Sequence, residues 1–119
     1  MPTVAQDYRV LPHETVTLDA MIGDGQGGGH SVFLGEELIA QGASELRNVT
    51  VGVGSAIASK VLVVASTAVD VQSAHDNVSV EVVLRGGVPS VQPIEQTTMV
   101  EPGGNESFLT VITFVGAGG

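Results

Sequence analysis

The chain contains no cysteine, no tryptophan and only four aromatic residues among its 119 residues. Without cysteine, disulfide bonds and thiolate metal sites are excluded. The scarcity of aromatic rings also argues against a carbohydrate site in which sugars stack on exposed side chains. The three phenylalanines are expected to lie in the core.

Basic residues are also scarce. Four lysines and arginines stand against thirteen acids, which gives a formal net charge of −9. A chain this acidic is repelled by nucleic-acid phosphates and by anionic lipids, so we expect neither as a partner. The charge favours solubility instead.

Long apolar stretches are absent as well. The longest run covers only residues 61–65, which is far too short to span a membrane. Residues 1–7 contain neither the basic segment nor the apolar segment of a signal peptide, so we expect no signal peptide. These features predict a soluble protein and leave its compartment open.

Valine and glycine are abundant. The chain has 21 valines, and its 16 glycines divide the valine-rich segments at short intervals. β-branched residues suit pleated strands, and short strands separated by turns are typical of a sandwich. We therefore predict one all-β domain over residues 1–119, an antiparallel β-sandwich of jelly-roll or Greek-key type with about eight strands. A Gly-rich loop at 23–29 and a Gly-rich tail at 116–119 complete this prediction.

Alternation of apolar and polar residues locates the strands. The pattern is clearest at 14–22, 60–71, 77–84 and 107–115, and weaker at 31–34, 38–40, 43–46 and 48–53. Flanking glycines favour a short strand or turn over a helix at 35–42. Turns are predicted at 73–76, 86–87 and 103–105. Three prolines restrict 88–102 to loops or an edge strand.

Two of these strands, 60–71 and 107–115, are apolar on both faces. One face of a sandwich strand ordinarily meets water, so the second apolar face needs a cover. Either another segment of the chain or a neighbouring subunit can provide it. The residues that we assign to a subunit interface are Leu62, Val64, Leu109, Val111 and Val115.

A glycine motif for dinucleotides is formally present at Gly23, Gly25 and Gly28. The long helix that should follow it, with its N-terminus at the pyrophosphate, is missing from the pattern. Residues 23–29 are therefore interpreted as a hairpin tip or an arm between subunits.

Histidine chemistry has little support from spacing. His13, His30 and His75 lie far apart and form no zinc motif. His30 or His75 with a nearby acid remains a hypothetical general acid–base pair. We expect no enzyme activity, because no nucleophile or cofactor motif accompanies these residues.

Calcium is the most credible small ligand for this residue pattern. Asp70, Asp76 and Asn77 bracket one predicted turn, and Asp19 and Asp24 flank another. Oxygen donors that converge at loops suit Ca²⁺, although acids are also common in turns for conformational reasons. Asp24, Asp70, Asp76 and Asn77 are the weak candidate ligands.

These observations favour a non-enzymatic structural protein that forms a homo-oligomer or a lattice. A capsid decoration or shell component of a phage-like virion is the setting that its composition suggests. The alternative is a β-sandwich module that binds a carbohydrate or another small ligand, with or without calcium.

Overall fold

The computed structural model describes residues 1–23, 26–71 and 76–116. These residues form ten strands and one four-residue helix, which makes the protein all-β. The elements are β1 (Thr3–Val10), β2 (Thr15–Ile22), β3 (Gly27–Leu34), β4 (Glu37–Ala43), β5 (Glu45–Val53), α1 (Gly54–Ile57), β6 (Val61–Val69), β7 (Asn77–Arg85), β8 (Gly87–Val88), β9 (Val91–Met99) and β10 (Asn105–Gly116).

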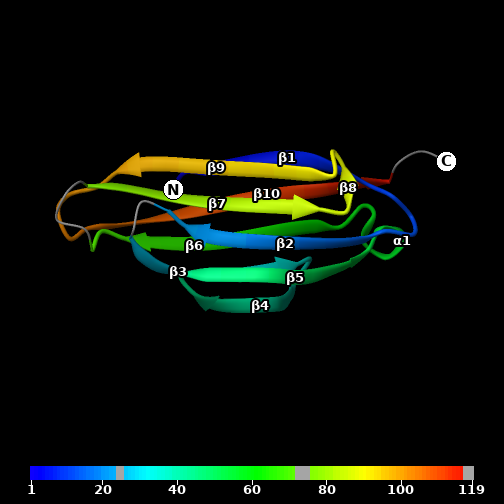
Figure 1. Cartoon of the computed structure of the whole chain (residues 1–119), viewed down its shortest axis with the longest axis horizontal. Helices are drawn as coiled ribbons and strands as arrows, with labels where there is room; N and C mark the ends of the chain where they lie inside the picture. The colour runs from blue at the N-terminus through cyan, green and yellow to red at the C-terminus, as the bar shows by residue number, and fades with distance from the viewer. Residues whose placement is uncertain (24–25, 72–75, 117–119) are drawn as a thin grey trace.

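Two sheets pack face to face to form a sandwich that is long in the strand direction (Figure 1). The six-stranded sheet has the order β4-β3-β6-β10-β1-β8, and the four-stranded sheet has the order β5-β2-β7-β9. Most pairs are antiparallel, but β1 lies parallel to β10. The purely antiparallel arrangement that we predicted therefore fails at this one pair, because the first and last strands meet side by side.

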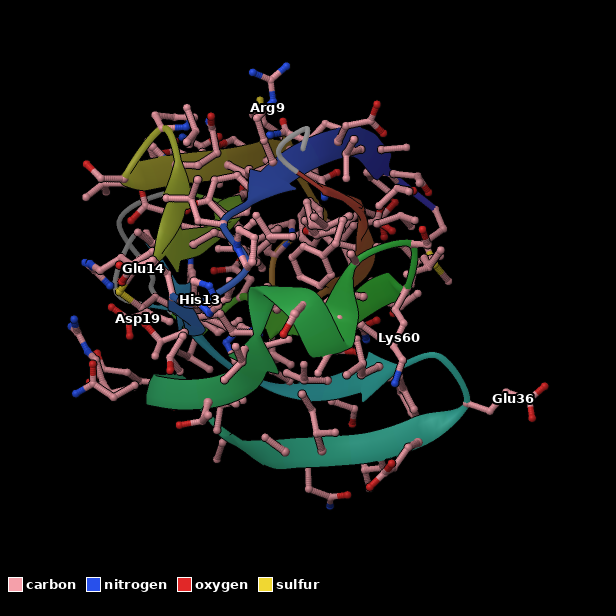
Figure 2. All side chains as sticks on the ribbon, turned by 90° about the vertical axis from the view of Figure 1, so that its right-hand side faces the viewer. Arg9, His13, Glu14, Asp19, Glu36 and Lys60 are labelled. Atoms are coloured by element: carbon pink, nitrogen blue, oxygen red, sulfur yellow. The ribbon has the colours of Figure 1, made fainter. Side chains whose placement is uncertain are left out.

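Alternate residues of each long strand fill the space between the sheets, as the view along the strands shows (Figure 2). Period-two alternation places these side chains on one face of each strand. The bulkiest buried residues are Tyr8, Phe108 and Phe114. A main cluster and a smaller cluster around Phe108 make up the core.

Tyr8 also fastens the end of the sandwich. Its hydroxyl donates a hydrogen bond to the Pro89 carbonyl oxygen at 2.6 Å and accepts one from the Gly87 amide at 2.9 Å. Burial raises the pKa of this phenol, while the hydrogen bond from the Gly87 amide lowers it in part. Tyr8 is buried, and its hydroxyl has the partners that a buried hydroxyl requires.

The four clear strands are confirmed as β2, β6, β7 and β10, with ends that differ from the prediction by one or two residues. The segments 43–46 and 48–53 join into the single strand β5, with a positive φ of 52° at Asn48. The stretch 88–102 contains β9, an edge strand that carries Pro93 where no further strand needs its amide. β1, β8 and α1 were not predicted, and β8 begins at Gly87, where a turn was expected.

The Gly-rich loop is shorter than predicted. Gly27, Gly28 and Gly29 belong to β3 and pair with β6, so they form no arm. Gly28 has a φ of +148°, and a Cβ atom there would collide with the Thr67 carbonyl oxygen. Glycine is thus required for the close approach of two strands. Residues 24–25 and the end of the tail, 117–119, lie outside the described residues.

Candidate functional site

The outer face of the six-stranded sheet is the most unusual surface of the described chain. Strand register aligns five apolar side chains in one row across β4, β3, β6, β10 and β1. We call this row the ridge; it consists of Leu38, Phe33, Val63, Val111 and Ala5. None of the five belongs to the core clusters, so the prediction that all three phenylalanines lie in the core is wrong for Phe33. Leu38 and Ala5 are exposed, and the other three residues of the ridge are partly exposed.

On β3 and β6, smaller residues lie beside the ridge, two and four positions further along the strands, whereas β10 has Leu109 at the position two residues along. Here Ser31 is in register with Ala65, and Gly29 is in register with Thr67. We call these four residues the trough. They line a groove of about 520 Å³, which Met1, Gln41, Ala43, Ser107 and Leu109 also border. No acidic, lysine or arginine side chain is among the residues that line the groove, and its polar groups include the Thr67 and Ser107 hydroxyls, which lie 3.3 Å apart.

The same face carries few charges. Across the rows of the ridge and the trough, register brings together no acid and no base among the described residues. Asp7 and Arg9 are on the outward face of β1, where they stand opposite Thr113 and Val115 of β10, beyond the ridge. A sheet face with this composition is typical of a protein contact rather than of a water-facing surface.

The outer face of the four-stranded sheet is different, because it is charged. Glu81 of β7 stands directly opposite Glu95 of β9, an arrangement that is unfavourable unless water screens both carboxylates. On the same face Asp19 is almost fully buried, with 3% of its surface exposed. The charged outer face of the four-stranded sheet is therefore suited to contact with water, whereas the outer face of the six-stranded sheet is suited to contact with protein.

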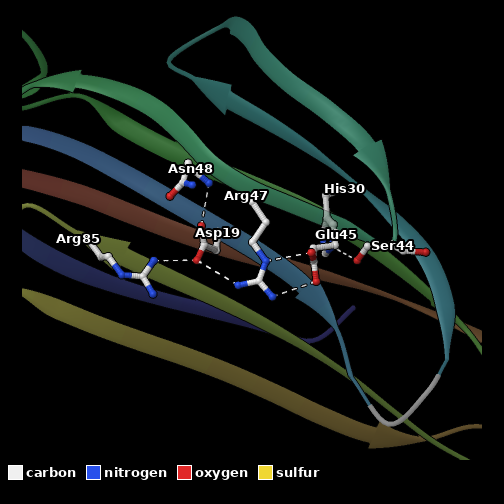
Figure 3. Close-up of polar contacts among 7 residues, drawn as sticks. All are labelled: Asp19, His30, Ser44, Glu45, Arg47, Asn48 and Arg85. Carbon is white, nitrogen blue, oxygen red and sulfur yellow. Dashed lines mark hydrogen bonds and ion pairs between the residues drawn. The ribbon is translucent and has the colours of Figure 1, made fainter.

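Asp19 is buried by the residues that bind it (Figure 3). Its Oδ2 atom lies 2.7 Å from Nη1 of Arg85 and 3.7 Å from Nη1 of Arg47, while its Oδ1 atom accepts a 2.8 Å hydrogen bond from the Asn48 amide. Arg47 also binds Glu45, with 2.9 Å between Nε and Oε1. Asp19 thereby ties β2 to β7 and to the irregular turn of β5 at Asn48.

The electrostatics of Asp19 reflect two opposing effects. Burial raises the pKa of this carboxyl group, but the hydrogen bonds from Asn48 and Arg85 and the charges of Arg85 and Arg47 outweigh burial and hold the pKa below its usual value. Asp19 is thus ionised at neutral pH, and both arginines are engaged. We interpret the cluster as a structural fastening of the four-stranded sheet.

Inside the sandwich, His30 and Ser66 form a short hydrogen bond, with 2.6 Å between Nδ1 and Oγ. The other ring nitrogen lies 3.2 Å from the Ser44 carbonyl oxygen (Figure 3). A carbonyl only accepts, so Nε2 carries the proton and Nδ1 accepts from the Ser66 hydroxyl. Both side chains are buried, and neither partner of His30 is an acid. The hypothetical acid–base pair at His30 therefore finds no acid here, and His75 lies outside the described residues.

Burial lowers the pKa of His30, and the hydrogen bond to Ser44 offsets part of this effect. A histidine held neutral in the folded state makes the fold lose stability as the pH falls below 6.5, the ordinary value for the unfolded chain. We expect the urea concentration at the unfolding midpoint to decrease when the pH is lowered from 7.5 to 5.5. The decrease should persist in His13→Gln, which alters an exposed histidine, and should shrink in His30→Asn. An equal decrease in His30→Asn would contradict this assignment.

The calcium candidates within the described residues form hydrogen bonds with the chain itself. Asp70 accepts a hydrogen bond from the Gly103 amide at 3.3 Å, and the backbone carbonyl of Asn77 accepts one from Gln26. Asp76 bonds Val100 through its backbone, and Asp24 lies outside the described residues. Over residues 1–23, 26–71 and 76–116, no group of three or more histidines and acids is arranged to hold a metal. Calcium binding stays a prediction without a described site.

The five predicted interface residues fall on two different faces. Leu62 and Val64 are fully buried in the core of the chain itself, so their face of β6 is covered from within. Leu109, Val111 and Val115 lie on the outer face. Alternation alone could not show which face of β6 enters the core. That assignment requires knowing which strands pair with β6, and the sequence does not provide this information. Phe33 and Val63 therefore replace Leu62 and Val64 on the candidate surface.

The outer face of the six-stranded sheet is the main guide to function. None of the described residues forms a helix that is long and apolar enough to cross a membrane. Searches with the chain find no matching family model, no matching curated protein and no matching solved structure.

Proposed function

We propose that this chain is a non-enzymatic structural protein that assembles through the outer face of its six-stranded sheet. The observation that carries the proposal is the ridge, an uninterrupted apolar row beyond the core. Exposed apolar area of this kind costs free energy in water and is stabilised by burial against a partner. The acidic groups elsewhere would keep the unassembled subunit in solution.

The size of the face is adequate for a specific contact. Five long strands spaced about 4.8 Å apart, each with about eight residues at about 3.3 Å per residue, make a face of about 600 Å². Standard protein interfaces bury about 800 Å² on each partner. A contact through this face is therefore close to the standard size.

A shell or lattice is the setting that we propose for this assembly, as in the decoration of a phage-like virion. The support is a small sandwich built from valine and glycine, together with a single extended contact face. In this setting the ridge holds each subunit on its neighbour, and the charged face of the four-stranded sheet faces water.

A second candidate function is the binding of a neutral small ligand, such as a sugar, in the groove over the trough. The Thr67 and Ser107 hydroxyls and the nearby Gln41 amide favour it, since neutral polar groups in a groove can fix a polyhydroxy ligand. A ligand bound only by the folded state raises the melting temperature. A panel of sugars, with and without Ca²⁺, that produces no shift would argue against this function.

Light scattering at several protein concentrations tests the main proposal. We expect a native mass that is a multiple of the 12.1 kDa chain mass, that decreases on dilution and that EDTA does not change. The EDTA control separates assembly through the ridge from assembly through calcium. A mass of 12.1 kDa at every concentration would contradict the proposal.

A further inference from the structure

The ridge and the trough have complementary relief on a single surface. Large side chains, Phe33 and Val63, stand in one row, and the neighbouring positions on the same two strands hold Ser31, Gly29, Ala65 and Thr67. The groove at the trough shows that this difference in size leaves real space. A surface with a ridge beside a trough can fit a copy of itself if one rotation exchanges the two rows.

We infer that two copies of this chain pack face to face about a two-fold axis that runs across the strands, between the ridge and the trough. This inference rests on the proposed function and adds the identity of the partner and the symmetry of the contact. The rotation reverses the strand direction and preserves the lateral order of the strands. It places Phe33 of each copy over the trough of β3 in its partner, and Val63 over the trough of β6. The fit of large against small residues is confined to these two strands, because on β10 the same rotation sets Val111 over Leu109.

A two-fold axis along the strands would also bring these faces together. It would set ridge against ridge and trough against trough, which holds the sheets apart and leaves the two grooves empty. Well-packed interfaces have densities close to those of protein interiors, so unfilled grooves are unfavourable. The relief therefore selects the axis across the strands.

Charge supports the same arrangement. Each chain carries a net charge of −9, so two copies associate only if their acids are kept apart. Asp7, the acid on the outward face of β1, is two residues from Ala5 along the strand and faces Thr113, beyond the ridge. The axis across the strands sends the partner's copy of this acid to the opposite end of the interface. The distance between the two carboxylates is then about 20 Å, which exceeds the screening length of about 8 Å at physiological salt.

The trough residue Ala65 provides the sharpest test. Leucine at position 65 adds apolar surface and would tighten any association that depends only on hydrophobic area. In the proposed packing it fills the space that Val63 of the partner needs, at two symmetric sites in each dimer. We expect Ala65→Leu to raise the dimer dissociation constant by about 30-fold or more. Thr97→Leu, on the exposed outer face of β9, is the matched control and should leave the constant within about threefold.

Cross-linking provides a second measurement, which does not require a larger side chain in the trough. Gln41 lies in the same row as Ser31 and Ala65, next to the proposed axis. It therefore faces Leu38 of the partner subunit and is offset from the second copy of Gln41 by only about 7 Å along the strands. The chain has no cysteine, so Gln41→Cys introduces a single thiol. The offset and the separation of about 10 Å between packed sheets place the two positions about 12 Å apart, so a bifunctional maleimide of that length should link two Gln41→Cys chains and should not link Thr97→Cys chains.

The outcomes separate this inference from the proposed function. A wild-type protein that is monomeric at every concentration overturns both. An oligomer that Ala65→Leu strengthens or leaves unchanged, or that cross-links through Thr97→Cys and not through Gln41→Cys, overturns the two-fold packing and leaves assembly intact. Two results together support the inference. Ala65→Leu loses the dimer while its circular dichroism is unchanged, and Gln41→Cys chains form cross-links while Thr97→Cys chains do not.

Discussion

Val63→Asp is expected to convert the assembled protein into monomers while the sandwich stays folded. Val63 lies at the centre of the ridge, between Phe33 and Val111, and it does not belong to the core. A carboxylate there would be removed from water on assembly without a base to pair with. We expect the dissociation constant to increase at least about 100-fold, which corresponds to about 2.7 kcal/mol. Light scattering or sedimentation at matched concentrations measures this change.

Thr97→Asp is the control for Val63→Asp. It adds the same charge to an exposed position of β9, on the outer face of the other sheet. Its native mass should equal that of the wild-type protein, because the charged face stays in water. If Val63→Asp keeps the wild-type mass, or if both variants dissociate equally, the ridge is not the contact surface.

Leu62→Ala is expected to have the opposite outcome, although Leu62 is the next residue along the same strand. Its side chain is fully buried in the main core cluster. Truncation removes apolar contacts and leaves a cavity, which costs about 3 kcal/mol of unfolding free energy. For a domain with a total stability of about 5–15 kcal/mol this is a severe loss. Urea unfolding at one fixed protein concentration measures it.

The native mass should distinguish the two variants as clearly as their stability does. Leu62→Ala that remains folded should assemble like the wild-type protein, because its ridge is intact. Val91→Ala, an exposed position on β9, should lower the unfolding free energy by less than about 1 kcal/mol. Dissociation of Leu62→Ala without loss of stability would show that the inner and outer faces of β6 are wrongly assigned.

Much of the fold was accessible from the sequence. Alternation of apolar residues in 14–22, 60–71, 77–84 and 107–115 predicted four strands that the structure contains. The prolines of 88–102 allowed an edge strand, and β9 is one. These predictions succeed because period two and proline geometry are local properties of the chain.

β1 escaped prediction because its signal is weak over Thr3–Val10. Its inward positions include Gln6 as well as Val4, Tyr8 and Val10, so apolar and polar residues do not alternate cleanly. The strand forms because β10 and β8 supply pairing partners that are distant in sequence. The Gly27–Gly29 segment joins β3 for a similar reason, since contact with β6 requires residues without side chains.

The candidate surface shows the same division between local and distant information. The sequence by itself determined that the strands at 60–71 and 107–115 are apolar on both faces, because that property can be counted residue by residue. Which face enters the core was decided only by tertiary structure. Leu62 and Val64 point at the four-stranded sheet, and Val63 points away from it, because β6 is enclosed between β3 and β10 in one particular orientation. The ridge exists only after five strands align in register, and no single strand encodes that alignment.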